Sequence, residues 1–233
     1  MTGKLIVIEG TDGSGKATQT KRVIDFLNAK GYSCFKFGFP QYGSATGDIV
    51  GDCYLGKNNR RNGGSWFKEG ASNVHPLLSS AFYAGDRFYH KNTILRAKTE
   101  GKIVVLDRYY QSNMAHQGGK LRTLTEREEL WRKLELLEFE YFGIPKEDLT
   151  VFLHMPTSIA IALREKRTRE TGAHADGHEA DPNHLRMAEE TYLQLAERFN
   201  WPTIKCAPSG NIDSLKSVEE ITPEIVGHIL PKL

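Results

Sequence analysis

Short apolar runs alternate along the chain with longer amphipathic stretches. The runs are mostly apolar or β-branched and end at polar or turn residues, which is typical of buried strands in a parallel sheet. They predict five strands, at Leu5–Glu9, Ser33–Phe37, Ile103–Asp107, Thr150–His154 and Thr203–Cys206. The amphipathic stretches predict helices at about Lys16–Lys30, Thr46–Leu55, Pro76–Lys98, Glu126–Phe142, Thr157–Arg169, Asn183–Asn200 and Ser217–Leu230. This order predicts a three-layer α/β/α fold, with helices on both faces of a five-stranded parallel sheet.

Two segments interrupt this alternation. Residues 57–70 are polar and glycine-rich, which predicts an exposed loop insertion. Residues 171–183 are poor in apolar side chains and rich in His, Asp and Gly, which predicts a mobile surface loop. The chain has no internal repeat and no linker, so we expect residues 1–233 to form a single domain.

Composition narrows the range of partners. The formal charge of +2 is too small to indicate nucleic acid or an anionic membrane as a partner, so charge that binds phosphate must be local. The three cysteines, Cys34, Cys53 and Cys206, have neither zinc-site spacing nor a disulfide framework. Without a signal-peptide pattern or an apolar run long enough to span a bilayer, we expect a cytoplasmic protein.

A phosphate-binding loop stands between the first predicted strand and the first predicted helix. Its sequence, G-T-D-G-S-G-K, fits the G-x-x-x-x-G-K motif in the strand–loop–helix context that the motif requires. Backbone N–H groups and the helix N-terminus would surround a phosphate of ATP, and the lysine would reach its β- and γ-phosphates. A glycine-rich turn without a ligand is the alternative. The expected ATP-binding residues are Gly10, Thr11, Asp12, Gly13, Ser14, Gly15, Lys16, Ala17 and Thr18.

The position after the lysine departs from the general motif. Ala17 stands where Ser or Thr usually holds Mg²⁺, and Thr18 is rotated by about 100° along the helix. We therefore expect Mg²⁺ to rest on ATP oxygens, on water and on the carboxylates of Asp12 or Asp107. Arg108 follows Asp107 at the end of a predicted strand, where it would clamp phosphate. A salt-bridged strand terminus is the alternative for this pair.

Four further segments follow in a fixed order. They read F-P-Q-Y-G from Phe39, Y-A-G-D-R from Tyr83, D-R-Y-Y-Q-S-N-M-A-H-Q from Asp107, and L-R-E-K-R-T-R from Leu163. Together with the phosphate loop they resemble the thymidylate kinase family of P-loop nucleoside monophosphate kinases, over nearly the whole chain. The resemblance implies Mg²⁺-dependent transfer of the γ-phosphoryl group of ATP to dTMP, giving dTDP and ADP, and it implies a homodimer.

The resemblance also assigns an acceptor site. Asp12 would contact the sugar 3′-hydroxyl, Tyr83 would stack on thymine, Arg87 would meet a base carbonyl, and His116 replaces the usual aromatic beside the 2′ position. Gly38 stands where some members have an arginine. The implied substrate-binding residues are Asp12, Phe39, Pro40, Tyr42, Tyr83, Arg87, Arg108, Ser112, Asn113, His116 and Gln117.

The catalytic cations follow from the same resemblance. Some members carry an arginine in the phosphate loop where this chain has Gly13, so a lid at about residues 164–183 would supply the charge. The expected catalytic residues are Lys16, Arg108, Arg164, Arg167 and Arg169. A phosphate monoester is already an anion and needs no general base, so the chemistry depends on positioning and charge neutralisation.

Other functions are compatible with parts of this pattern. A deoxynucleoside kinase, a kinase of another monophosphate and a non-catalytic P-loop regulator would each share the phosphate loop, but none would need the whole set of segments. His174, Asp176 and His178 could bind a metal, although a solvated loop is the favoured interpretation.

Overall fold

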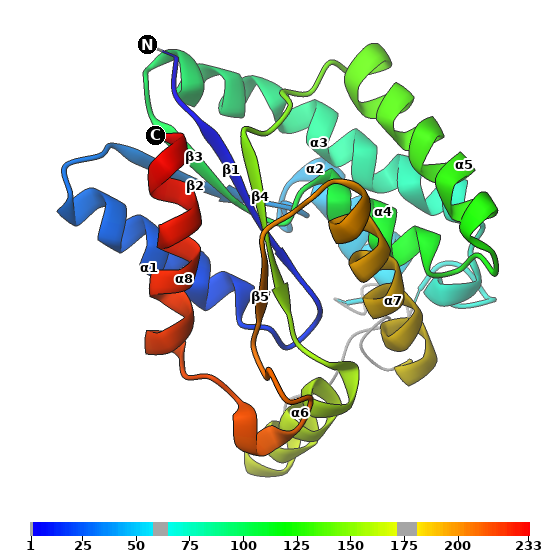
Figure 1. Ribbon diagram of the computed structural model, residues 1–233. Helices are drawn as coiled ribbons and strands as arrows, with labels where there is room; N and C mark the ends of the chain where they lie inside the picture. The colour runs from blue at the N-terminus through cyan, green and yellow to red at the C-terminus, as the bar shows by residue number, and fades with distance from the viewer. Residues whose placement is uncertain (1, 58–64, 172–180) are drawn as a thin grey trace.

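The computed structural model describes residues 2–57, 65–171 and 181–233. Its centre is a five-stranded parallel sheet in the order β2-β3-β1-β4-β5 (Figure 1). The strands are β1 (Leu5–Gly10), β2 (Cys34–Gly38), β3 (Ile103–Asp107), β4 (Leu149–His154) and β5 (Thr203–Lys205). The predicted α/β fold and all five strands are confirmed, each to within one residue at either end.

Helices cover both faces of this sheet. The α-helices are α1 (Lys16–Ala29), α2 (Ala45–Asp48), α3 (Pro76–Thr99), α4 (Tyr110–Gly118), α5 (Leu124–Glu135), α6 (Thr157–Thr171), α7 (Pro182–Arg198) and α8 (Val218–Ile229). Two π-helical turns, η1 (Ile49–Leu55) and η3 (Leu136–Tyr141), continue α2 and α5. Short 3₁₀ turns are η2 (Ala71–Asn73), η4 (Ile212–Ser214) and η5 (Leu230–Lys232).

The core has two halves because side chains alternate along each strand. In β1, Leu5 and Val7 pack into the cluster beneath α3, α4, α5 and α7, whereas Ile6 and Ile8 face α1 and α8. Both faces of the central strand are therefore fully buried, as the continuous apolar runs indicate. Burial on both sides holds the carboxyl end of β1 in place, and the phosphate loop begins there.

Three helical elements of the structure differ from the prediction. Helix α4 was not predicted, because its buried face carries polar side chains such as Gln111, Asn113 and Gln117 and so lacks an apolar stripe. The helices predicted at 46–55 and 126–142 each begin as an α-helix and end as a π-helical turn. The second one also starts earlier than predicted, because Thr123 and Glu126 form a reciprocal capping box.

The predicted loop insertion is only partly described. Within residues 65–70, Phe67 is half-buried and its ring lies 5.9 Å from that of Phe82 and 6.3 Å from that of Tyr54. The described end of the segment is a loop with several exposed residues, as predicted, but Phe67 packs against a small core that the sequence did not indicate. His174, Asp176 and His178 lie outside the described residues.

Candidate active site

The phosphate loop joins β1 to α1 and is held against the end of β4. Thr11 Oγ1 donates to Met155 O at 2.7 Å and accepts from Met155 N at 2.8 Å. Gly13 and Gly15 have φ values of 77° and 76°, a conformation that favours glycine. A side chain at Gly10 would come within 2.7 Å of Leu153 O. The glycines at these positions are therefore required by the shape of the loop.

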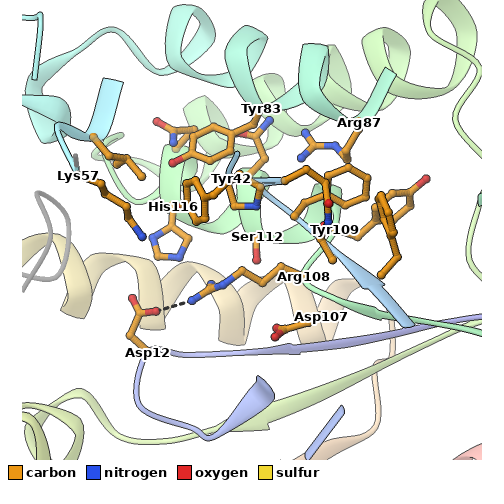
Figure 2. A pocket seen from close by; sticks show the side chains of 18 of the residues that line it. Asp12, Tyr42, Lys57, Tyr83, Arg87, Asp107, Arg108, Tyr109, Ser112 and His116 are labelled. Atoms are coloured by element: carbon orange, nitrogen blue, oxygen red, sulfur yellow. Dashed lines mark hydrogen bonds and ion pairs between the residues drawn. The ribbon is translucent and has the colours of Figure 1, made fainter. Parts of the chain in front are cut away.

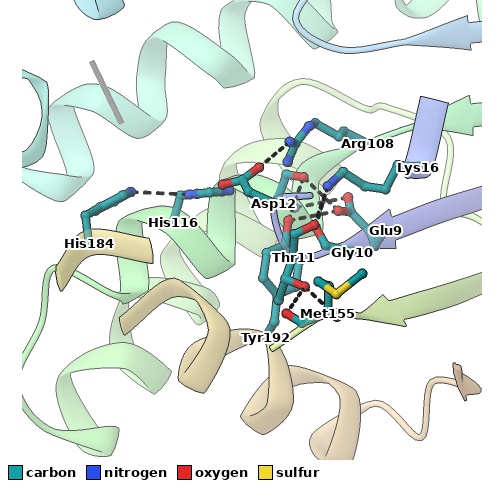
Figure 3. Close-up of polar contacts among 11 residues, drawn as sticks. Glu9, Gly10, Thr11, Asp12, Lys16, Arg108, His116, Met155, His184 and Tyr192 are labelled. Carbon is teal, nitrogen blue, oxygen red and sulfur yellow. Dashed lines mark hydrogen bonds and ion pairs between the residues drawn. The ribbon is translucent and has the colours of Figure 1, made fainter. Parts of the chain in front are cut away.

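Lys16 lies inside this loop. Its Nζ donates to Gly10 O at 2.7 Å and to Thr11 O at 2.8 Å (Figure 3). Burial, together with the nearby Arg108 guanidinium, lowers the pKa of Lys16 to about 8 against the opposite effect of neighbouring carboxylates. The ammonium is thus held at the mouth of the loop by backbone oxygens.

Asp12 and Arg108 join the loop to the end of β3. Arg108 Nη2 donates to Asp12 Oδ1 at 2.7 Å (Figure 3). Burial raises the pKa of Asp12, but the Arg108 guanidinium and other nearby cations outweigh burial and bring the pKa well below its usual range. The backbone of Arg108 has a φ of 65°, in the left-handed region that a non-glycine residue rarely adopts. The turn that aims this guanidinium at the loop is therefore strained.

Glu9, one residue before the loop, is fully buried and collects four donors. Its carboxylate accepts from Tyr109 N, from Ser112 N and Oγ, and from Tyr192 OH, at 2.7–3.1 Å. Burial raises the pKa of Glu9, against these hydrogen bonds and the Arg108 charge. Glu9 thus ties β1 to α4 and α7. From the sequence, Glu9 is only the last residue of the first predicted strand, because its partners are about 100 or more residues away.

A pocket of about 550 Å³ opens in front of Arg108 (Figure 2). It lies between the ends of β2 and β3 and helices α3 and α4, which carry most of its lining residues. All eleven residues expected to bind the acceptor line it, and so does Asp107. Gln41, Leu55, Lys57 and Tyr109 also line it, although the sequence did not single them out.

One end of this pocket is built for a polar, flat ligand. Asn113 Nδ2 donates to Ser80 O at 3.2 Å, and Gln117 Oε1 accepts from Ser79 Oγ at 2.6 Å. Asn113 Oδ1 is buried without a hydrogen-bond partner among the described residues, whereas the Gln117 side chain also interacts with the Tyr54 hydroxyl. Amide side chains at this end of the pocket are suited to the polar edge of a flat ligand.

Arg87 enters the same pocket from α3. Its side chain is buried, and both Nε and Nη2 donate to Glu138 Oε1, the first at 2.9 Å. Glu138 lies on η3, 51 residues away, so no local pattern could have revealed it. Tyr83, one helical turn before Arg87, packs edge-on against Tyr54 with ring centroids 5.8 Å apart. The pair places an aromatic face and a guanidinium together, as their spacing predicts.

His116 forms the wall between the pocket and α7. Its Nδ1 lies 3.3 Å from His184 Nε2, and its ring is stacked on the His184 ring. Burial lowers the pKa of His116 to about 3, against the opposite effect of the Asp12 carboxylate. The imidazole is therefore neutral at physiological pH.

Neither of the two described lid arginines lines this pocket. All three are on α6; Arg164 is half-buried, Arg169 is exposed, and neither lines the cavity. The Arg167 side chain and residues 172–180 lie outside the described part of the chain. The structure thus brings Lys16 and Arg108 together, and the roles of Arg164 and Arg169 remain predictions.

Carboxylates suited to Mg²⁺ are few. Within residues 2–57, 65–171 and 181–233, no group of three His, Cys, Asp or Glu side chains could hold a metal. Asp12 is paired with Arg108, whereas the Asp107 side chain has no hydrogen bond or ion pair within that part of the chain. Such a sparse donor set fits Mg²⁺, which keeps water and phosphate oxygens as its main ligands.

Comparison with known proteins decides which family has this site. The thymidylate kinase family model matches residues 8–217. The chain belongs to the thymidylate kinase family. Members of this family are nucleoside monophosphate kinases, so the protein is a phosphotransferase, as the sequence predicts.

Two relatives match this chain over most of their length and most of its own. A probable thymidylate kinase of Pyrococcus horikoshii is 31% identical over 100% of this chain and 98% of its own. The thymidylate kinase of Mycobacterium tuberculosis is 29% identical over 82% of this chain and 85% of its own. The solved thymidylate kinase of Candida albicans shares the fold, with a TM-score of 0.66 at 20% identity over 98% of this chain and 91% of that one.

No helix in the described ranges has the length and hydropathy that would let it cross a bilayer.

Proposed function

We propose that this protein transfers the γ-phosphoryl group of ATP to dTMP. The observation that carries the proposal is the pocket that places Tyr83 and Arg87 beside the amide side chains of Asn113 and Gln117. Thymine presents an N–H donor flanked by two carbonyl acceptors, an edge that amide side chains and a guanidinium can match. Arg87 supplies a cation for a carbonyl on the same edge, and Tyr83 supplies a flat surface for the ring. Cytosine reverses the polarity at positions 3 and 4, so it would present an amino donor to Arg87 where thymine presents a carbonyl.

The remaining site residues position two phosphates. The loop N–H groups and Lys16 would hold the β- and γ-phosphates of ATP, and Arg108 would hold the acceptor phosphate between the loop and the pocket. Asp12 anchors Arg108 and would accept from the sugar 3′-hydroxyl. Because both nucleotides would meet at the mouth of one loop, the acceptor oxygen lies in line with the transferring group, and little further chemistry is required.

We propose Asp107 as the protein carboxylate nearest to Mg²⁺, with Asp12 engaged by Arg108 instead. Bound there through water, Mg²⁺ would neutralise the charge on the phosphates. Arg164, Arg167 and Arg169 remain candidates for a further cation at the γ-phosphate. A single domain, a homodimer and a cytoplasmic location are likewise proposals.

A panel of acceptors tests the function. ADP formation from ATP would be measured with dTMP, dUMP, dCMP, AMP, GMP and thymidine, and with ATP alone as the control. We expect dTMP to be preferred over dUMP by roughly 5- to 100-fold, the value of one buried methyl group, and over dCMP by more. Because the Candida albicans enzyme is described as having a broad substrate specificity, the panel also tests whether this pocket accepts several bases. Equal kcat/KM values for dTMP and dCMP would refute the proposed base site.

A further inference from the structure

Asp86 lies on α3, one residue before Arg87, and its side chain is only 1% exposed. Its Oδ2 accepts from Gln41 N at 2.9 Å, and its Oδ1 accepts from Thr46 Oγ1 at 2.7 Å. The turn between these two donors carries Tyr42. A single buried carboxylate of α3 therefore holds both ends of a turn that lies 40 to 45 residues away in the sequence.

A second side chain of α3 supports the same turn. His90, one helical turn after Asp86, places its Nε2 3.1 Å from Ser44 Oγ and 3.6 Å from Asp86 Oδ1. Ser44 Oγ also accepts from Gly47 N at 3.1 Å and so caps α2. The turn is therefore fastened to α3 at its middle as well as at its two ends.

The turn places Tyr42 in the wall of the pocket that Arg108 also lines (Figure 2). The Tyr42 ring packs on the backbone of η1, where a side chain at Gly51 would come within 2.9 Å of Tyr42 Cδ1. The chain enters the turn next to Arg108, because Phe39 N donates to Asp107 O at 3.1 Å. Tyr42 thus belongs to the side of the pocket where Arg108 would hold the acceptor phosphate.

The partners of Asp86 determine which side chain can hold this turn. Both partners are donors, so a carboxylate, which has only acceptors, matches the two, whereas an amide would turn an N–H group toward one of them. Neither Asp86 nor Thr46 is among the residues that line the pocket, so the carboxylate would act through the turn. We propose that Asp86 is a positioning residue that sets the affinity for the acceptor phosphate by holding Tyr42 in the pocket wall. This inference rests on the proposed function, since it presumes that a nucleoside monophosphate fills the pocket.

The experiment measures, by calorimetric titration, the Kd of dTMP and the Kd of thymidine, which lacks the phosphate. In Asp86→Asn, we expect the Kd of dTMP to rise at least about tenfold, as for one hydrogen bond to a charged group, and the Kd of thymidine to stay within about twofold. Tyr83→Leu should instead raise both Kd values alike, because it removes the surface on which the base would stack. Asp25→Asn, at an exposed position of α1, is the matched control for the same chemical change.

Thr46→Val tests the same path while leaving α3 intact. It removes one of the two donors, so the Kd of dTMP should rise about three- to tenfold, with little further effect in an Asp86→Asn background. An equal loss of affinity for dTMP and thymidine in Asp86→Asn would overturn the inference and leave the proposed function standing, since it would show a general distortion of α3. An unchanged Kd of dTMP in Asp86→Asn would also overturn it, as would an unchanged Kd in Thr46→Val if Asp86→Asn does not fold. A wild type that does not bind and phosphorylate dTMP would remove the proposed function, and the inference with it.

Discussion

Lys16 contacts the backbone of its own loop rather than the core. Its ammonium bonds to Gly10 O and Thr11 O, so its loss should leave the fold in place. We expect Lys16→Ala to lower kcat/KM for phosphoryl transfer by at least about 10³-fold, because the cation at the transferring phosphate is lost. Lys21→Ala, an exposed lysine on the same helix, is the control. Near-normal turnover in a correctly folded Lys16→Ala variant would contradict the role of the loop.

His116 predicts a pH effect on stability. Its pKa is about 3 in the fold and about 6.5 in an unfolded chain, so between these values only the unfolded chain takes up the proton. Stability should therefore fall as the pH drops from about 6.5 toward 3, and His116 contributes nothing to this slope above that window. We expect the decrease in the free energy of unfolding to be smaller in His116→Phe. Urea unfolding at several pH values measures it, and parallel curves for the two proteins would contradict the assignment.

Residues of the site were predictable to different degrees. The acceptor residues were predictable because short motifs place them at one strand end or one helix face, as Tyr83 and Arg87 show. Glu138 was not, because its partner Arg87 is 51 residues away and an isolated Glu in a helix looks like a solvated side chain. Lys57 was interpreted as part of a polar loop, yet its Nζ lies 4.4 Å from the centre of the Tyr42 ring and it lines the pocket.

Among the elements, α3 and η3 are joined by a buried ion pair. Arg87 and Glu138 are 1% and 0% exposed, so removing one leaves a charge without compensation. We expect Glu138→Leu to lower the free energy of unfolding by about 3–5 kcal/mol. The double variant Arg87→Leu/Glu138→Leu should recover much of that loss, because neither charge is then buried alone. Glu140→Leu, an exposed position of η3, is the control for urea unfolding, and equal effects at the two positions would show that the ion pair is not important.

Helix α6 carries the candidate lid arginines. Gly13 provides no charge from the phosphate loop, so a further cation must come from elsewhere. We expect replacement of Arg164, Arg167 and Arg169 by alanine to lower kcat at least roughly a hundredfold and to change the KM for dTMP little. Steady-state kinetics of the triple and single variants measure this, with Lys166→Ala as the control. A triple variant that keeps its kcat would show that the arginines of α6 do not take part.

The elements show where periodicity fails as a guide. The strands were predictable because burial on both faces leaves continuous apolar runs. Helix α4 was not, because it places Gln111, Asn113 and Gln117 inward to serve a site and to bind Thr150 and Ser79. A helix that faces a pocket loses the apolar stripe by which amphipathic helices are found.

At the scale of the whole molecule, the outer face of α3 is the surface through which we expect two copies to associate. Leu78 and Tyr89 are 47% and 63% exposed on a helix that also contributes Tyr83 and Arg87 to the pocket. Between them, Gly85 has no described atom within 4 Å of the position a side chain would occupy, so another surface can approach closely. We expect a homodimer through α3, which Leu78→Glu/Tyr89→Glu should convert to a monomer. Light scattering after gel filtration measures it, with Tyr32→Glu as the control, and a monomeric wild type at micromolar concentration would contradict it.

The left-handed backbone of Arg108 has a consequence for redesign of this protein. A glycine there would relieve a conformation that costs about 1–3 kcal/mol, yet it would also remove the guanidinium that joins Asp12 to the pocket. Any procedure that scores sequences by thermal stability alone will therefore favour glycine at this position and erase the activity. A thermostable version has to be sought with Arg108 held constant, at sites remote from the turn that it strains.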